Sequence, residues 1–154
     1  MARRRGRGSE KQPKTKRRLA GRSRKTPRSE PSASVDYRRW HPVWQVGVID
    51  RNGPFSWSEI EAADGWSIWE RLAAFETMTW HEIIGRDHHE IDVDLLEKSA
   101  QDRLREIGQD DVDSLCSLRI AGERRVWGIL DRNVFKILWW DPNHTVYPVS
   151  KKNT

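Results

Sequence analysis

The last third of the chain alternates apolar and polar residues with a period of two, which is the repeat of a half-buried strand. Three such runs cover residues 114–120, 124–130 and 134–140. The segments between them, Ala121-Gly122-Glu123 and Asp131-Arg132-Asn133, have compositions that suit tight hairpin turns. The pattern therefore predicts a three-stranded antiparallel β-meander.

The middle of the chain has the periodicity and capping residues of helices. The strongest signal lies at about 93–107, where apolar residues form one stripe, Asp92 can cap the N-terminus and Gly108 follows the C-terminus. Three shorter helices are expected after capping-box patterns of the type Ser/Thr-x-x-Glu. Their ranges, with the two box residues of each, are 57–63 (Ser56, Glu59), 68–77 (Ser67, Glu70) and 80–85 (Thr79, Glu82).

Ahead of the helices, residues 43–49 are rich in β-branched and aromatic side chains and lead into an Asn-Gly-Pro turn, which predicts a strand. Residues 1–34 have almost no large apolar side chains, so burial cannot offset their ordering entropy. We therefore expect a disordered basic tail over residues 1–39 and one domain over 40–150. The predicted fold is α+β: an N-terminal strand, several helices, then the three-stranded meander.

Charge divides the chain in the same place. The whole sequence has 28 Lys and Arg against 23 Asp and Glu, but residues 1–40 hold 15 of the basic and 3 of the acidic residues. The tail is therefore positive and the domain negative, which predicts that the tail binds a polyanion, either RNA or the ribosome. A solubilising tail, or one that binds an acidic protein surface, is the alternative. The predicted nucleic-acid-binding residues are Arg3, Arg4, Arg5, Arg7, Lys14, Lys16, Arg17, Arg18, Arg22, Arg24, Lys25 and Lys136.

Cysteine and histidine usage narrows the class of protein. Cys116 is the one cysteine, so an internal disulfide and a Cys-based metal cluster are excluded, and its apolar neighbours predict a buried, inert thiol. His81-Glu82 and His88-His89-Glu90 lack the H-E-x-x-H spacing, so we predict a polar loop there and neither metal nor other cofactor. Convergence of His81, His88 and Glu90 on a divalent metal is the alternative.

No apolar run is long enough to span a bilayer, and the N-terminus has no apolar core of a secretory signal. A cytoplasmic protein without a membrane partner is therefore expected. Nine tryptophans are many for 154 residues. Most are expected in the core, with Trp40 and Trp44 as the candidates for exposure to a base or a protein partner.

The candidate chemistry lies in the C-terminal segment. Alternation places Arg125 and Trp127 on one face of the middle strand, while Asp141-Pro142 ends the last strand and leaves His144 and Tyr147 in a loop. A cation, an imidazole and a phenol are the groups that cleavage of RNA through its own 2′-OH requires. In a purely structural role, Arg125 would pair with a carboxylate such as Asp141, His144 would bond a turn carbonyl and Tyr147 would pack on the last strand.

In the C-terminal segment, over about residues 95–149, the motifs follow in this order: Leu-Arg-Ile, a hairpin, Arg-Val-Trp, a second hairpin, an apolar strand and His-x-x-Tyr. This order of motifs resembles the C-terminal half of the RelE/YoeB-type toxin ribonucleases. The resemblance implies a metal-independent endoribonuclease that cuts messenger RNA and is neutralised by an antitoxin. It also implies roles: Arg125 as the phosphate-binding arginine, Arg119 as the arginine of the preceding strand, and His144 and Tyr147 as the acid–base region. The acidic domain and the helical segment 56–90 depart from the family pattern.

Two non-catalytic interpretations remain beside this hypothesis. In one, the protein is a nucleic-acid- or ribosome-associated adaptor that is anchored by its tail and recruits a protein with its acidic domain. In the other, the domain is an interaction module whose acidic face covers a basic enzyme, and nucleic acid has no part.

Overall fold

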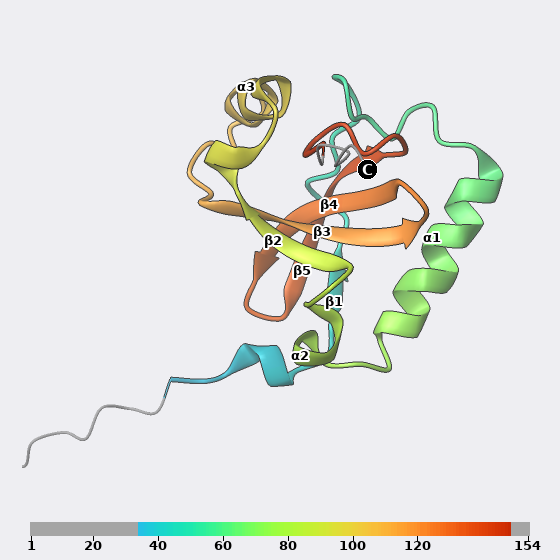
Figure 1. Ribbon diagram of the computed structural model, residues 1–154, viewed down its shortest axis with the longest axis vertical. Coiled ribbons are helices and arrows are strands. Elements are labelled where there is room, and N and C mark those ends of the chain that lie inside the picture. Colours follow the sequence, from blue (N-terminus) through green and yellow to red (C-terminus); the bar gives the residue numbers. More distant parts are fainter. Residues whose placement is uncertain (1–33, 149–154) are drawn as a thin grey trace, which may run out of the picture. The chain divides into compact units, whose positions relative to one another are not determined.

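The computed structural model describes residues 34–148, and the fold is given for that part of the chain. Five strands form one mixed sheet in the order β1-β5-β4-β3-β2, where β1 runs parallel to β5 and all other neighbours are antiparallel (Figure 1). The elements are η1 (Tyr37–Arg39), β1 (Val43–Gln45), α1 (Ala62–Phe75), α2 (Trp80–Ile83), β2 (His88–Asp92), η2 (Val93–Leu95), α3 (Lys98–Glu106), β3 (Ser114–Ala121), β4 (Arg124–Asp131) and β5 (Val134–Asp141).

The sheet corrects the predicted architecture. The strands β3, β4 and β5 are joined by two hairpins, but the sheet is not a three-stranded meander, because β1 and β2 extend it on its two edges. The polar segment His88–Asp92, predicted as a loop, is a strand paired with β3. Its sequence has no apolar alternation, so only the unpaired backbone groups along the edge of β3 explain why it is extended.

The described residues contain three α-helices, whereas the sequence predicted four helical ranges. The two ranges 57–63 and 68–77 are replaced by α1, which begins at Ala62, so Ser67 lies inside it and its hydroxyl donates to the Ala63 carbonyl at 3.1 Å. The capping box before α2 does form, because the Thr79 backbone N–H donates to the Glu82 carboxylate at 2.7 Å.

The predicted long helix is shorter than expected. A single 3-10 turn occupies its first residues and α3 starts only at Lys98. Gly108 follows α3 with a φ of 69°, a backbone conformation that favours glycine at a helix C-terminus, as the sequence predicted. Over 34–148, none of the helices has the length and apolar content needed to cross a bilayer.

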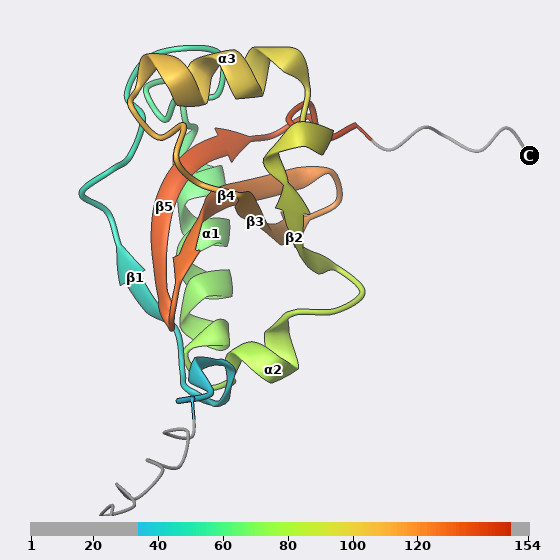
Figure 2. The same ribbon diagram turned by 90° about the vertical axis from the view of Figure 1, so that its left-hand side faces the viewer.

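Apolar side chains cover both faces of the sheet. One core lies between the sheet and the helices α1 and α2, and includes Leu72, Trp80 and Leu118. The other lies on the opposite face under α3, and includes Leu104, Trp127 and Trp139. Figure 2 shows α1 running along the sheet and α3 lying across its end. Cys116 is buried in the first core, and burial raises the pKa of its thiol, as expected for an inert cysteine.

The segment before β1 packs on the domain. Arg38 forms an ion pair with Glu90 of β2, and the Asp36 carboxylate lies 3.2 Å from the His81 ring of α2. The Tyr37 ring packs edge-on against Trp40. Residues 35–39, which the sequence placed in the tail, are thus in contact with the domain. The predicted disorder of residues 1–33 lies outside the described residues.

Candidate active site

A pocket of about 290 Å³ opens on the face of the sheet that α1 does not cover. Its floor is formed by the middle strands, and its walls are formed by β2, by the loop before β2 and by the segment that follows β5. The pocket brings together three of the four residues that the sequence singled out for catalysis. The lining residues are Arg86, Asp87, His89, Ile91, Ser117, Arg125, Trp127, His144 and Tyr147.

Arg119 and Arg125 are directly opposite each other on β3 and β4. Like charges in this position destabilise a sheet, so each arginine needs a negative partner. Arg119 has one, because its Nη1 donates to the Asp87 carboxylate at 3.0 Å. Arg125 donates instead to the backbone carbonyls of Gly122 and Arg124, at 2.7 and 3.2 Å. Among the residues of 34–148, no carboxylate forms a salt bridge with Arg125.

The pKa of the Arg125 guanidinium is lowered, first by burial and then by the positive charge of Arg119. Both effects disfavour the charged form of Arg125. They are offset only in part by the charges of three carboxylates, none of which forms a salt bridge with it within residues 34–148: Asp141, Asp87 and Glu123. An oxyanion bound in the pocket would remove this deficit. Arg125, with Arg86 in the lining of the same pocket, is therefore suited to hold a phosphate.

Asp141 lies opposite Arg125 on β5, but within residues 34–148 the two side chains form no salt bridge. Its buried carboxylate accepts hydrogen bonds from the indole N–H of Trp127 at 3.2 Å, from the N–H and hydroxyl of Thr145 at 2.8 and 3.0 Å, and from the Val146 N–H at 3.1 Å. These bonds fold the segment after β5 back over the sheet. The structural alternative, a direct salt bridge between Asp141 and Arg125, is therefore not formed, although the charge of Asp141 acts on Arg125 from a greater distance.

His144 is carried by this folded-back segment. Its φ of 56° is uncommon for a residue with a side chain, and such conformations persist only where the surroundings impose them. Burial, and then the charge of Arg125, lowers the pKa of its imidazole below 6.5. The ring is therefore neutral at pH 7 and able to accept a proton. Tyr147, three residues on, is half-buried and completes this wall of the pocket.

His89 is the lining residue that the sequence interpretation missed as a catalytic candidate. It lies on β2 opposite Ser117, and Ser117 lies opposite Trp127, so the three side chains form one row across the sheet. The only signal in the sequence was the local pair His88-His89. Alternation along a strand would have sent the two rings to opposite faces, but nothing local showed that this segment is a strand.

His88 faces the other side of the sheet and has a structural role. Burial, and then the charge of Arg71, lowers the pKa of His88 to about 4, so its ring is neutral at pH 7. Its Nδ1 accepts a hydrogen bond from the backbone N–H of Arg119 at 3.0 Å. The ring of Phe75 packs edge-on against it. His88 thus holds the strand that carries Arg119.

The alternative metal site does not form. His81 lies on α2, His88 is buried under α1, and Glu90 is in the ion pair with Arg38. Within residues 34–148, no three His, Cys, Asp or Glu side chains gather as a set of metal ligands.

The remaining cations of the predicted site are mostly neutralised. Arg124 forms an ion pair with Asp64 of α1, and Lys136 lies 3.3 Å from the Asp131 carboxylate, outside the pocket. Arg132 packs over the ring of Tyr37. Of the five cations in the three C-terminal strands and their turns, Arg125 and Arg132 form no salt bridge within residues 34–148, and only Arg125 of these two lines the pocket. The other predicted nucleic-acid-binding residues, from Arg3 to Lys25, lie outside the described part of the chain.

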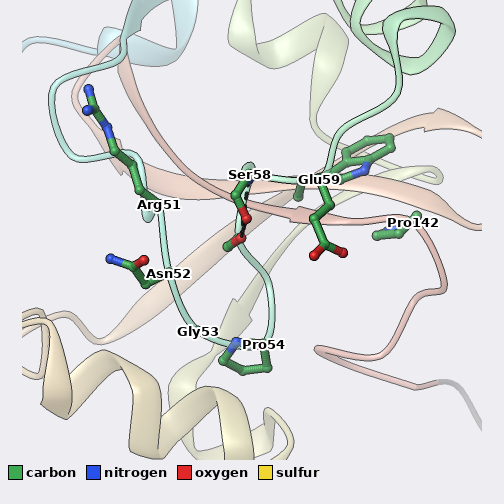
Figure 3. Close-up of a pocket in the computed structure, with 9 residues that line it drawn as sticks. Arg51, Asn52, Gly53, Pro54, Ser58, Glu59 and Pro142 are labelled. Atoms are coloured by element: carbon green, nitrogen blue, oxygen red, sulfur yellow. Dashed lines mark hydrogen bonds between the residues drawn. The ribbon is translucent and has the colours of Figure 1, made fainter.

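A larger cavity of about 450 Å³ lies beside the loop that leads from β1 to α1 (Figure 3). Its polar groups come from Arg51, Asn52, Ser56, Ser58 and Glu59, and the two serine hydroxyls are hydrogen-bonded to each other at 2.6 Å. None of the described residues that line it is a histidine or a tyrosine. It has no acid–base pair for chemistry near neutral pH, so we place the candidate active site in the smaller pocket.

Comparisons with protein-family models, with curated proteins and with solved structures found no match for this chain. The case for a function therefore rests on the pocket.

Proposed function

We propose that this chain is a metal-independent endoribonuclease of the RelE/YoeB type, with its active site in the pocket around Arg125. The observation that carries the proposal is the cross-strand pair of Arg119 and Arg125, in which, among residues 34–148, only Arg119 has a carboxylate partner. A half-buried cation that forms no salt bridge within residues 34–148 is suited to a bound phosphate, and the neutral imidazole of His144 lies in the lining of the same pocket.

The proposed reaction is cleavage through the neighbouring hydroxyl of the RNA. His144 takes the proton of the 2′-OH, which attacks the phosphorus, and Arg125 stabilises the negative charge that grows on the phosphorane. A further group must donate a proton to the leaving 5′ oxygen, and Tyr147, which the resemblance places with His144 in the acid–base region, lines the same pocket. Arg119, held by Asp87, acts through its charge on Arg125 and not by direct contact. The tail would add affinity for RNA or the ribosome.

The direct test is cleavage of RNA by the purified full-length protein in EDTA, with RNA free and on ribosomes. Cleavage by the wild type is expected, and Arg125→Ala and His144→Ala are each expected to lower the rate by about 10² to 10³-fold. Arg132→Ala is the matched control, since this arginine lies over Tyr37 and outside the pocket. Absence of cleavage by the wild type in both settings, or full activity of both variants, contradicts the proposal.

A second candidate function, the non-catalytic adaptor, is favoured by the outer face of α1. Trp66 and Trp69 of this helix are 72% and 65% exposed. Of the two tryptophans that the sequence predicted to be exposed, Trp40 is 48% exposed but Trp44 is half-buried. An apolar groove of about 270 Å³ borders Trp69. Exposed carboxylates, Glu59, Glu61 and Glu70, flank this face. Its partner would be an amphipathic protein segment with Lys or Arg beside its apolar residues.

The adaptor hypothesis predicts binding of a basic amphipathic helical peptide, measured by tryptophan fluorescence. The double variant Trp66→Ala, Trp69→Ala is expected to weaken that binding at least about tenfold, because exposed tryptophans dominate such interfaces. An acidic peptide with the same apolar residues is the control and should not bind. Equal affinity for the two peptides, or unchanged affinity of the variant, contradicts the hypothesis.

A further inference from the structure

His89 and His144 line the pocket from two different walls, β2 and the segment that follows β5. The order of strands across this part of the sheet is β2, β3, β4, β5. His89 belongs to β2, Arg125 to β4, and His144 to the segment that follows β5. All three line the same pocket of about 290 Å³. A phosphate held by Arg125 would therefore share the pocket with two imidazoles, one from each of these walls.

The alternation of each strand places His89 on the pocket face. His89, Ser117 and Trp127 are directly opposite one another on neighbouring strands, and Arg125 is two residues from Trp127 and so on the same face. The His89 side chain is exposed, and within residues 34–148 its ring has no hydrogen-bond partner. His89 therefore has no evident structural role, in contrast to its neighbour His88.

In-line displacement at phosphorus needs an acid and a base on opposite sides, because the attacking and leaving oxygens lie about in line. His144, with a lowered pKa, is suited to be the base. A general acid works best when its pKa is close to the working pH, and the ordinary pKa of an imidazole is nearer to neutrality than that of a phenol. The charged groups that share the pocket with His89 are Arg86, Asp87 and Arg125, of which Asp87 is engaged by Arg119.

We infer that His89 is a second catalytic residue of this pocket, the general acid that protonates the leaving 5′ oxygen of an RNA phosphodiester. The inference rests on the proposed function. In the step, the O2′–P bond forms and the P–O5′ bond breaks. The 2′ proton moves to His144, and the proton of the His89 imidazolium moves to O5′. The products are a 2′,3′-cyclic phosphate and a 5′-hydroxyl, and solvent exchange restores the two histidines.

The test compares two RNAs of one sequence that contains a site cut by the wild type. One has the natural oxygen at the 5′ bridging position, and the other has sulfur there, which leaves as a thiolate and needs no proton. His89→Ala is expected to slow cleavage of the oxygen RNA by about 10² to 10⁴-fold, but to change cleavage of the sulfur RNA less than about tenfold. His144→Ala is expected to slow both RNAs. His81→Ala, at an exposed histidine outside the pocket, should cleave both at the wild-type rate.

Each other outcome has a distinct meaning. Full activity of His89→Ala on the oxygen RNA, or equal losses on both RNAs with an unchanged circular dichroism spectrum, overturns the assignment of His89 as the acid. In that case cleavage by the wild type and loss in His144→Ala leave the proposed function standing. If the wild type cuts neither RNA, free or on ribosomes, the proposed function itself fails and the role of His89 fails with it.

Discussion

Replacing Asp141 by alanine is expected to destabilise the domain by about 3 kcal/mol and to abolish RNA cleavage. The Asp141 side chain is buried, with 1% of the residue exposed, and accepts four hydrogen bonds. Its removal leaves the indole N–H of the fully buried Trp127 without an acceptor, which costs about 1 to 3 kcal/mol by itself. It also releases Thr145 and Val146, so His144 is no longer held in the pocket.

The two readouts for Asp141→Ala are urea unfolding followed by circular dichroism, and the rate of RNA cleavage. Asp131→Ala is the matched control, because Asp131 ends the preceding strand but its side chain is 57% exposed and, within the described part of the chain, is bonded only to Lys136. We expect that control to change the stability by less than about 0.5 kcal/mol. If Asp141→Ala unfolds at the wild-type urea concentration, the carboxylate does not hold the segment after β5, and the account of the pocket wall is wrong.

Asp50→Ala is expected to destabilise the domain by about 3 kcal/mol, because it removes a buried carboxylate and leaves the indole N–H of the buried Trp139 without an acceptor, while Arg103 keeps its ion pair with Glu106. Arg103 of α3 donates two hydrogen bonds to the Asp50 carboxylate, at 2.8 and 2.7 Å, and the indole N–H of Trp139 donates a third at 3.0 Å. Asp50 thereby joins the segment after β1 to α3 and to the core around Trp139. Asp102→Ala, at an exposed carboxylate of the same helix, is the control and should leave the urea midpoint unchanged.

The contribution of Asp50 is expected to depend on pH. Burial by itself would raise the pKa of this carboxyl, but the hydrogen bonds from Arg103, Asn52 and Trp139 outweigh burial and lower the pKa below 3.8. A carboxyl with a lowered pKa in the folded state stabilises the fold above its unfolded pKa of about 3.9, and this is lost as the pH falls through the folded value. The difference in unfolding free energy between wild type and Asp50→Asn should therefore shrink from pH 6 to pH 2. A constant difference contradicts this assignment.

The strands and turns of the C-terminal third could be predicted because their signals are local. Alternation sets β3, β4 and β5, and the turns between them contain Gly122 and Arg132, with φ of 55° and 60°, as tight hairpins require. The same alternation placed Arg125 and Trp127 on one face. His144 and Tyr147 could be placed in a loop because Pro142 cannot continue a ladder.

The helical region was predicted less well because its signals conflict. Ser67 and Glu70 have the spacing of a capping box, but the helix that buries Ile68, Leu72 and Phe75 on the sheet begins five residues earlier. The burial of an apolar face outweighs one cap, since a cap contributes only about 1 kcal/mol. Sequence reasoning about single caps therefore divided one helix into two.

By itself, the sequence determined the charge division, the three C-terminal strands and the residues with chemistry on them. Only the tertiary structure decided that β1 and β2 form the two edges of the sheet and that His89 faces the pocket. It also decided that Asp141 holds the segment after β5, while Arg125 forms no salt bridge with a carboxylate of the described residues. The physical reason is the separation, along the sequence, of the residues that interact. Alternation and turn chemistry act between residues a few positions apart, whereas β1 pairs with β5 and β2 pairs with β3 across long stretches of chain. The partner of a charged side chain is chosen by that pairing, and so the pocket exists only in the folded domain.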